Sequence, residues 1–164
     1  MIEGVELKQL ARHYDERGYF QEIIRSTDDF FVGFGQWSVS VMYQGVIKAF
    51  HCHTTQYDYW FVPIGVIKAV LCDLRPGNKA AYLDKYPYYD KRNPPFNPPT
   101  DEYLLGDNQP AQVLSIPPGV AHGLKVLQGP AYLFYVTSHV YNPEDEGRIP
   151  FDALGYDWHK VEIK

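Results

Sequence analysis

The sequence has few cysteines and no long apolar run. Only Cys52 and Cys72 occur among its 164 residues, and no apolar stretch approaches the ~20 residues of a membrane-spanning helix. The first residues contain no signal-peptide core. We therefore expect a cytoplasmic protein without a membrane partner, whose cysteines are buried reduced thiols; a disulfide between them is the alternative.

The sequence also lacks any block of charge of one sign. It contains 15 Lys and Arg against 20 Asp and Glu, a formal net charge of −5. Binding to nucleic acid needs a clustered cationic face, so this balance excludes a nucleic-acid partner. A small anionic ligand needs only two or three nearby cationic side chains, so this charge balance is compatible with binding one.

Signals for helices are scarce, whereas signals for strands are abundant. The 14 Tyr, 9 Phe and 3 Trp residues argue against disorder. Short segments rich in β-branched and aromatic residues, bounded by Gly or Pro, predict strands. They cover residues 36–43, 46–53, 58–62, 65–74, 111–116 and 131–141. Many short strands separated by turns predict a single all-β domain over residues 1–164, built as a sandwich or barrel.

Residues 85–110 interrupt this pattern as an insertion rich in proline and tyrosine. The segment contains six prolines, which excludes a central strand. Its aromatic residues favour a packed lid or an interface over a disordered linker. We expect it to close over the mouth of the barrel; surface decoration is the alternative.

Three histidines and one aspartate have a spacing that suits a metal. Residues i and i+2 of a strand point to one face, so His51 and His53 project together. Asp58 opens the next strand and can return toward them, and His122 follows the turn at 117–121. Three imidazoles and a carboxylate form a first shell for a divalent metal. The alternative is that each histidine only satisfies a buried hydrogen bond.

The spacing of these residues resembles two known motifs. The pattern G-x5-H-x-H-x4-D-x6-G at 45–65, followed by P-x-G-x-x-H at 117–122, resembles the two cupin motifs, with Asp58 where metal cupins usually place glutamate. The resemblance implies a cupin (jelly-roll) β-barrel, also called a double-stranded β-helix.

A narrower resemblance covers most of the chain. Five segments, in the same order, are similar to signatures of the dTDP-4-dehydrorhamnose 3,5-epimerases. Each signature is weak by itself, and the ordered set is specific. They are DERGYFQE at 15–22, QWSVS at 36–40, GVIKAFH at 45–51, IPPGVAHG at 116–123 and YVTSHVYNPEDEG at 135–147.

This resemblance implies a function and a site. Members of the family are homodimers that use no metal and invert C3 and C5 of a 4-keto-6-deoxyhexose on a nucleoside diphosphate. By position, His51 is the base and Tyr135 the acid. The remaining matched positions are substrate-binding, the first three toward the nucleotide across the dimer interface: Arg17, Phe20, Glu22, Gln36, Ser38, Lys48, His122, Tyr141 and Glu146.

Two departures from the family concern the catalytic centre. Asp58 occupies the position of a family lysine that supports the enolate oxygen, and the C-terminal acid that orients the family's catalytic histidine is not matched. Two explanations are open. A divalent metal held by His51, His53, Asp58 and His122 could polarise the ketone. Alternatively, Asp58 itself is catalytic and orients His51, while Lys48 offsets charge at the oxygen.

Three functions are therefore compatible with the sequence. The first is an epimerase acting at C3, C5 or both of a dTDP-4-keto-6-deoxyhexose, with a nucleoside-diphosphate sugar as its partner and no cofactor required. The second is a metal-dependent cupin enzyme, an isomerase or oxygenase, acting on another small molecule. The third is a non-catalytic protein that binds a nucleotide sugar.

Overall fold

The computed structural model describes residues 1–75 and 98–160, which form ten strands and no helix. The all-β prediction is confirmed. No helix in these ranges is long and apolar enough to cross a membrane. The strands are β1 (Glu6–Gln9), β2 (His13–Asp15), β3 (Gly18–Phe20), β4 (Gln36–Met42), β5 (Ile47–Cys52), β6 (Asp58–Asp73), β7 (Thr100–Gly106), β8 (Gln112–Ile116), β9 (Val120–Thr137) and β10 (Gly147–Arg148).

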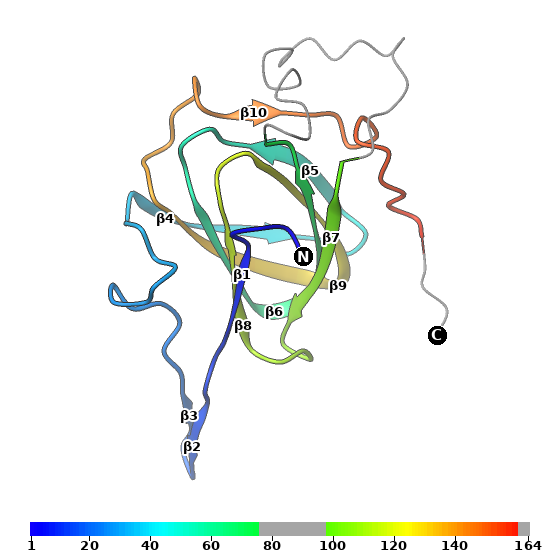
Figure 1. Ribbon diagram of the computed structural model, residues 1–164. Coiled ribbons are helices and arrows are strands. Elements are labelled where there is room, and N and C mark those ends of the chain that lie inside the picture. Colours follow the sequence, from blue (N-terminus) through cyan, green and yellow to red (C-terminus); the bar gives the residue numbers. More distant parts are fainter. Residues whose placement is uncertain (76–97, 161–164) are drawn as a thin grey trace.

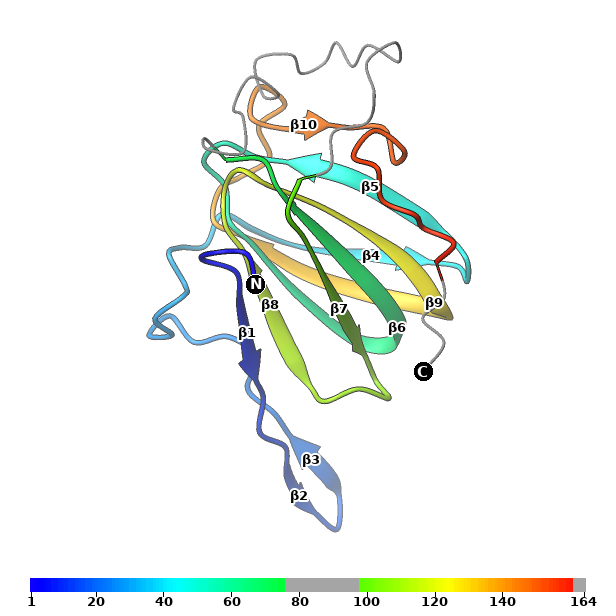
Figure 2. The ribbon, with the colours of Figure 1, turned by 45° about the vertical axis from the view of Figure 1, so that its right-hand side comes forward.

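Eight strands form one continuous antiparallel sheet, and β2 and β3 form a separate pair. The large sheet folds over into two layers, called here the first and the second sheet, and the long strands β6 and β9 run through both. The first half of β6 and the second half of β9 lie in one sheet with β1, β8 and β4. Their other halves lie in the second sheet with β7, β5 and β10. The register shifts between Phe61 and Ile67 mark where the pair bends from one sheet into the other. Figures 1 and 2 show the resulting jelly-roll sandwich.

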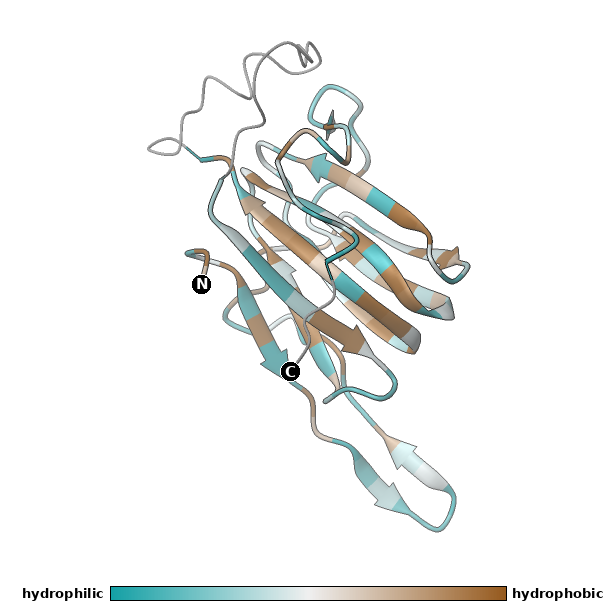
Figure 3. Cartoon of the chain, turned by 90° about the vertical axis from the view of Figure 1, so that its right-hand side faces the viewer, coloured by the Kyte–Doolittle hydropathy of each residue, from teal (hydrophilic) through white to brown (hydrophobic). Residues whose placement is uncertain are grey.

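The main core fills the space between the two sheets. Alternate residues of β6 and β9 point inward, including Ile67, Leu71, Leu124 and Leu133, each at most 4% exposed. Figure 3 shows this alternation of apolar and polar residues along the strands. Period-two burial on both inner faces is typical of sandwiches. The core ends below one mouth of the sandwich, where polar side chains replace it.

A second core lies on the outer face of the second sheet. The residues that alternate with the inward set, such as Phe50, Cys52 and Cys72, are covered there by the segment 149–158. Phe50 and Trp158 meet with ring centroids 5.3 Å apart. Both cysteines are buried and free, which confirms the prediction of reduced thiols. The chain after β10 thus holds β5 from outside.

The β2–β3 hairpin projects away from the sandwich (Figure 2). Every residue of its two strands is exposed. It contains Arg17 in its turn and Phe20 at its end. The structure therefore places two of the predicted nucleotide-binding residues outside the cavity of their own chain.

Two expectations about local structure were wrong. The segments 58–62 and 65–74 belong to one strand, β6, which bends past Pro63. Within the expected insertion at 85–110, residues Thr100–Gly106 form β7, paired with β6 at the edge of the second sheet. The prolines of the described part flank this strand, so its ladder is uninterrupted. Residues 85–97 of the expected lid lie outside the described residues.

Leu154→Ala tests the contribution of the second core to stability. Leu154 is 2% exposed, and emptying such a site costs about 2–4 kcal/mol of unfolding free energy. The same change at Leu127, which is 41% exposed, serves as the matched control and should cost less than about 1 kcal/mol. Urea unfolding of both variants measures the difference. Equal costs would contradict the assignment of this core.

Candidate functional site

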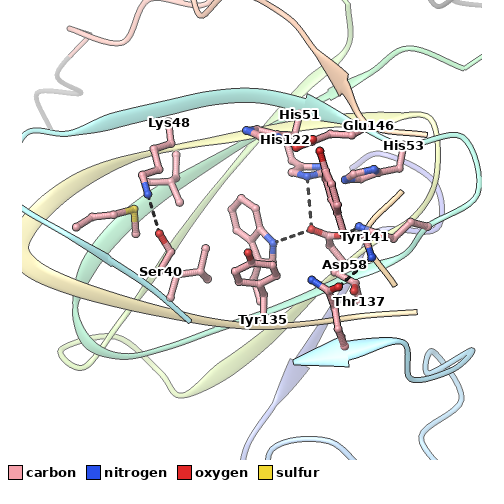
Figure 4. Close-up of a pocket in the computed structure, with 16 residues that line it drawn as sticks. Ser40, Lys48, His51, His53, Asp58, His122, Tyr135, Thr137, Tyr141 and Glu146 are labelled. Carbon is pink, nitrogen blue, oxygen red and sulfur yellow. Dashed lines mark hydrogen bonds and ion pairs between the residues drawn. The ribbon is translucent and has the colours of Figure 1, made fainter. Parts of the chain in front are cut away.

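A cavity of about 260 Å³ opens at the mouth of the sandwich, between the inner faces of the two sheets. Its walls combine titratable and apolar side chains (Figure 4). The lining residues are Gln36, Ser40, Met42, Lys48, His51, His53, Gln56, Asp58, Trp60, His122, Leu124, Leu133, Tyr135, Thr137, Tyr141 and Glu146.

His51 is held by a carboxylate from the far end of the chain. β10 pairs with the end of β5, with Arg148 opposite His51, and this pairing brings Glu146 beside the ring. His51 Nδ1 lies 2.9 Å from Glu146 Oε1. An ionised carboxylate only accepts, so Nδ1 donates and Nε2 of the neutral ring keeps its lone pair. The His51 side chain is 39% exposed and Glu146 only 11%, so the basic nitrogen is accessible and its partner is shielded.

Glu146 is kept ionised by its neighbours. Burial by itself would raise the pKa of this carboxyl, but hydrogen bonds from Arg148, Tyr141 and His51 outweigh burial and hold the pKa below its usual value. Arg148 Nη2 lies 3.2 Å from Oε2. One oxygen thus faces a guanidinium and the other faces His51. This arrangement corrects two expectations: Asp58 does not orient His51, and an acid partner for His51 is present in Glu146.

Asp58 lies deeper in the cavity, at the first position of β6. It is 5% exposed. Its Oδ1 accepts a hydrogen bond from Gln56 Nε2 at 2.8 Å, and its Oδ2 accepts one from Trp60 Nε1 at 3.3 Å. Both donors stand two residues from Asp58 in sequence. The carboxylate is therefore fixed by its own strand and faces His122 rather than His51.

His122 is the most enclosed imidazole of the cavity. Its Nδ1 lies 3.1 Å from the carbonyl oxygen of Val120, and its Nε2 lies 3.6 Å from Asp58 Oδ2. Burial lowers the pKa of His122 to about 4, although Asp58 acts in the opposite direction. The ring is therefore neutral at neutral pH.

Tyr135 occupies the wall opposite His51. It projects from the second half of β9, between Ser38 of β4 and Trp60 of β6 in the register, whereas His51 comes from β5 in the other sheet. Both side chains line the same cavity (Figure 4). The base and the acid implied by the family resemblance therefore line one cavity, from strands in different parts of the sheet.

Lys48 supplies a cation at the other end of the cavity from Asp58 (Figure 4). Its Nζ lies 2.7 Å from Ser40 Oγ across the inner space. Leu124, Leu133 and Met42 provide apolar surface in the same cavity. The site therefore combines a cationic end, apolar surface and an opposite end with histidine and carboxylate groups.

The other predicted substrate-binding residues fall into two groups. Gln36, His122, Tyr141 and Glu146 line the cavity with Lys48, and Ser38 adjoins it through the hydrogen bond from Gln36 Nε2 to Ser38 Oγ at 3.3 Å. The N-terminal residues lie elsewhere. Arg17 forms an ion pair with Asp15, and Glu22 forms one with Arg25.

The expected four-residue metal set is corrected to three. The ligand atoms of His53, Asp58 and His122 all lie within 4.8 Å of one another. His51 is not part of this group because its ring pairs with Glu146. β5 ends at Cys52, so His53 leaves the ladder and turns toward Asp58 and His122.

Sequence reasoning missed seven lining residues: Ser40, Met42, Gln56, Trp60, Leu124, Leu133 and Thr137. For most of them, the sequence contained a spacing that could have predicted their position. Gln56 and Trp60 stand two residues on either side of Asp58, Thr137 stands two after Tyr135, and Ser40 continues the alternation of Gln36 and Ser38. Residues at this spacing share a face of a strand.

Comparisons with known proteins agree with this geometry. The family model described as dTDP-4-dehydrorhamnose 3,5-epimerase matches residues 96–164. The spore coat polysaccharide biosynthesis protein SpsL of Bacillus subtilis is 42% identical, with 97% of each chain covered. The probable low-salt glycan biosynthesis epimerase Agl13 of Haloferax volcanii is 29% identical, covering 96% of this chain and 95% of its own.

A solved structure gives the same result for the fold. The dTDP-6-deoxy-D-glucose-3,5-epimerase RmlC of Legionella pneumophila, in complex with dTDP-4-keto-L-rhamnose, superposes with a TM-score of 0.73 at 25% identity. The match covers 98% of this chain and 81% of that one. The cupin jelly-roll expected from the sequence is confirmed.

Glu146→Gln tests the electrostatic role of the half-buried carboxylate. A carboxyl whose folded-state pKa is lowered stabilises the fold above its unfolded pKa of about 4.3, and this contribution disappears as the pH falls through the folded pKa. We expect the wild type to exceed the variant in unfolding free energy at pH 7, and the gap to narrow below about pH 4.3. Urea unfolding across pH measures it. Glu144→Gln, at an exposed position, is the control. A difference in unfolding free energy that does not change with pH would contradict this electrostatic role of Glu146.

Proposed function

Because this chain belongs to the dTDP-4-dehydrorhamnose 3,5-epimerase family, we propose that it inverts C3, C5 or both of a dTDP-4-keto-6-deoxyhexose. The single observation that carries the proposal is the pairing of His51 and Glu146 on one wall of a cavity with Tyr135 on the other. Family and relatives support a dTDP-sugar epimerase. The residues supply a base and an acid on opposite faces of a ring, which is what inversion requires.

His51 is proposed as the base. Protons α to a ketone become acidic when the resulting enolate is stabilised. Nε2 accepts that proton while Nδ1–H stays bonded to Glu146, whose negative charge stabilises the imidazolium that forms. Glu146 is thus a positioning residue. It touches His51 and acts through it.

Tyr135 is proposed as the acid. Its phenol donates a proton to the enolate carbon from the face opposite His51, and solvent restores the phenolic proton. The carbon leaves with inverted configuration, with one proton removed and one returned. Between the two steps, polar residues that line the cavity, including Gln36 and Tyr141, hold the substrate in place.

Nucleotide binding is proposed to involve two chains. Lys48 provides a cation for the diphosphate at the open end. Arg17 and Phe20 lie on the exposed hairpin, beyond the cavity of their own chain, so they would reach a ligand in a second copy. Trp37, Val39 and Val41 on β4 are 67%, 52% and 50% exposed; an exposed apolar strip of this kind marks an interaction surface. These features favour the homodimer. The cytoplasmic location stays a prediction from the sequence.

Deuterium incorporation tests the reaction. Incubation with a dTDP-4-keto-6-deoxyhexose in heavy water should introduce deuterium at C3, C5 or both, followed by NMR. We expect His51→Asn to slow incorporation at least about 100-fold, the usual contribution of a general base. Tyr135→Phe should retain exchange on the His51 face but form little inverted product.

Tyr132→Phe is the matched control for the phenol. Tyr132 pairs with Val41 and Ile64 in the same strand and does not line the cavity, so the variant should behave as the wild type. Wild-type protein that incorporates no deuterium at either carbon would overturn the epimerase. Tight binding of the nucleotide sugar without exchange would favour the non-catalytic binding protein instead.

Mixing two inactive variants tests the hairpin. Arg17→Glu should weaken nucleotide binding and His51→Asn should remove the base. If the hairpin serves the partner's cavity, each mixed dimer has one intact site, and random reassociation of equal amounts should restore about a quarter of wild-type activity. If the hairpin serves its own cavity, the mixture has no intact site. Activity no greater than that of the separate variants would therefore contradict the shared site.

A further inference from the structure

Three buried ligand groups meet at the inner end of the cavity. They are His53, Asp58 and His122, whose donor atoms lie within 4.8 Å of one another. They come from separate places in the fold: the end of β5, the start of β6 and the first half of β9. Figure 4 shows them together on the side away from Lys48. The sheet backbone therefore brings them together independently of the His51–Glu146 pair.

The contact between His122 and Asp58 brings two possible metal ligands together in a buried place. The Val120 carbonyl only accepts, so His122 Nδ1 carries the hydrogen of that 3.1 Å bond. The other ring nitrogen, Nε2, lies 3.6 Å from Asp58 Oδ2. An imidazole nitrogen and a carboxylate oxygen both bind divalent metals, so this contact offers two ligand atoms to one ion.

The separation of these atoms suits a metal ion. Two ligand atoms at about 2.1 Å from a tetrahedral ion are about 3.4 Å apart, close to the distance between Nε2 and Oδ2. His53 completes the set: within the described residues, no hydrogen bond ends on a nitrogen of its ring, and the ring lies 5.6 Å from that of His122. A ring nitrogen of His53 lies within 4.8 Å of the ligand atoms of both Asp58 and His122.

The surroundings of the three residues are those of a ligand shell. A ligating histidine usually donates its other ring N–H to a carbonyl or carboxylate, and ligating carboxylates are themselves hydrogen-bonded. His122 donates to Val120. Asp58 accepts from Gln56 and Trp60, which fixes the carboxylate and leaves Oδ2 directed at His122.

We propose that His53, Asp58 and His122 bind a divalent first-row transition metal, with open coordination positions facing the cavity. Two imidazoles and one carboxylate suit such an ion better than magnesium or calcium, which prefer oxygen ligands. Three protein ligands leave room for water or for an oxygen of a bound molecule. His51 is not a ligand, so the base and the metal coexist in one cavity.

The use of this metal in the reaction rests on the proposed function. A divalent ion polarises a carbonyl oxygen that enters its open position and so acidifies the adjacent carbon. Asp58, which would repel an enolate if left unpaired, then holds the cation that stabilises it. The metal site itself is independent of that reaction and is tested separately.

Metal binding to the full chain, purified without an affinity tag, tests the site. The protein is treated with a chelator, desalted and titrated with Zn²⁺ or Co²⁺. We expect about one ion per chain by elemental analysis after gel filtration, the content of one such three-ligand site, and visible absorption bands of Co²⁺ at low coordination number. Asp58→Asn and His53→Gln should each weaken Zn²⁺ binding more than about 100-fold. This loss exceeds the roughly 10- to 100-fold loss expected when a residue that only hydrogen-bonds a ligand is removed.

Two variants serve as matched controls. His51→Asn should retain the ion because His51 belongs to the pair with Glu146, and His13→Gln should retain it because His13 lies on the exposed hairpin. Thermal unfolding confirms that each variant is folded; His122 is not substituted, since it is 4% exposed and its loss endangers the core.

The outcomes separate the metal from the reaction. Absence of a bound ion, or equal binding by Asp58→Asn and the wild type, overturns the metal site. Loss of the ion from His51→Asn overturns the three-residue ligand set. A bound ion in a protein that exchanges no deuterium supports the site and overturns the proposed function. If deuterium exchange continues at the full wild-type rate after chelation, the epimerase reaction is supported and the metal takes no part in it.

Discussion

The hydrogen bond between His51 and Glu146 is the interaction on which the site depends. It joins residues 95 positions apart, and it exists because β10 pairs with the end of β5. The segment that follows β10 covers the outer face of the same sheet through Leu154 and Trp158. The second core thus fixes β10, β10 fixes Glu146, and Glu146 fixes the tautomer of His51. The proposed base is therefore supported by apolar packing on the opposite face of its strand.

The cavity separates tasks along its length. Lys48 gives one end a positive charge, and Asp58, His53 and His122 lie close together at the other end. His51 and Tyr135 lie between them on opposite walls (Figure 4). The two sheets make this separation possible, because each contributes one wall and β6 and β9 run through both. A carboxylate beside an enolate is unfavourable, and the cation proposed at Asp58 would offset this repulsion.

Much of the fold and part of the site could be predicted from sequence. β-Branched and aromatic segments located β4, β5 and β8, and the family resemblance assigned His51 and Tyr135 to one site. Long-range pairing could not be predicted: nothing local joins Glu146 to His51, so Asp58 was one of two open explanations for how His51 is oriented or the ketone is polarised. Strand spacing correctly placed His51 and His53 in one cavity, but it could not show that His51 pairs with Glu146 while His53 lies near Asp58 and His122. β7 was not predicted because residues 85–110 are rich in proline. The nearby prolines flank the strand instead of interrupting it.

The most direct test of the account is the kinetics of deuterium incorporation in Glu146→Gln. Glutamine keeps the size of the side chain but removes the charge that stabilises the His51 imidazolium. The account predicts that kcat for incorporation falls at least about 100-fold while KM changes little, because the loss is confined to the transition state. An unchanged kcat in a folded variant would contradict it, since His51 would then act without the partner that orients it.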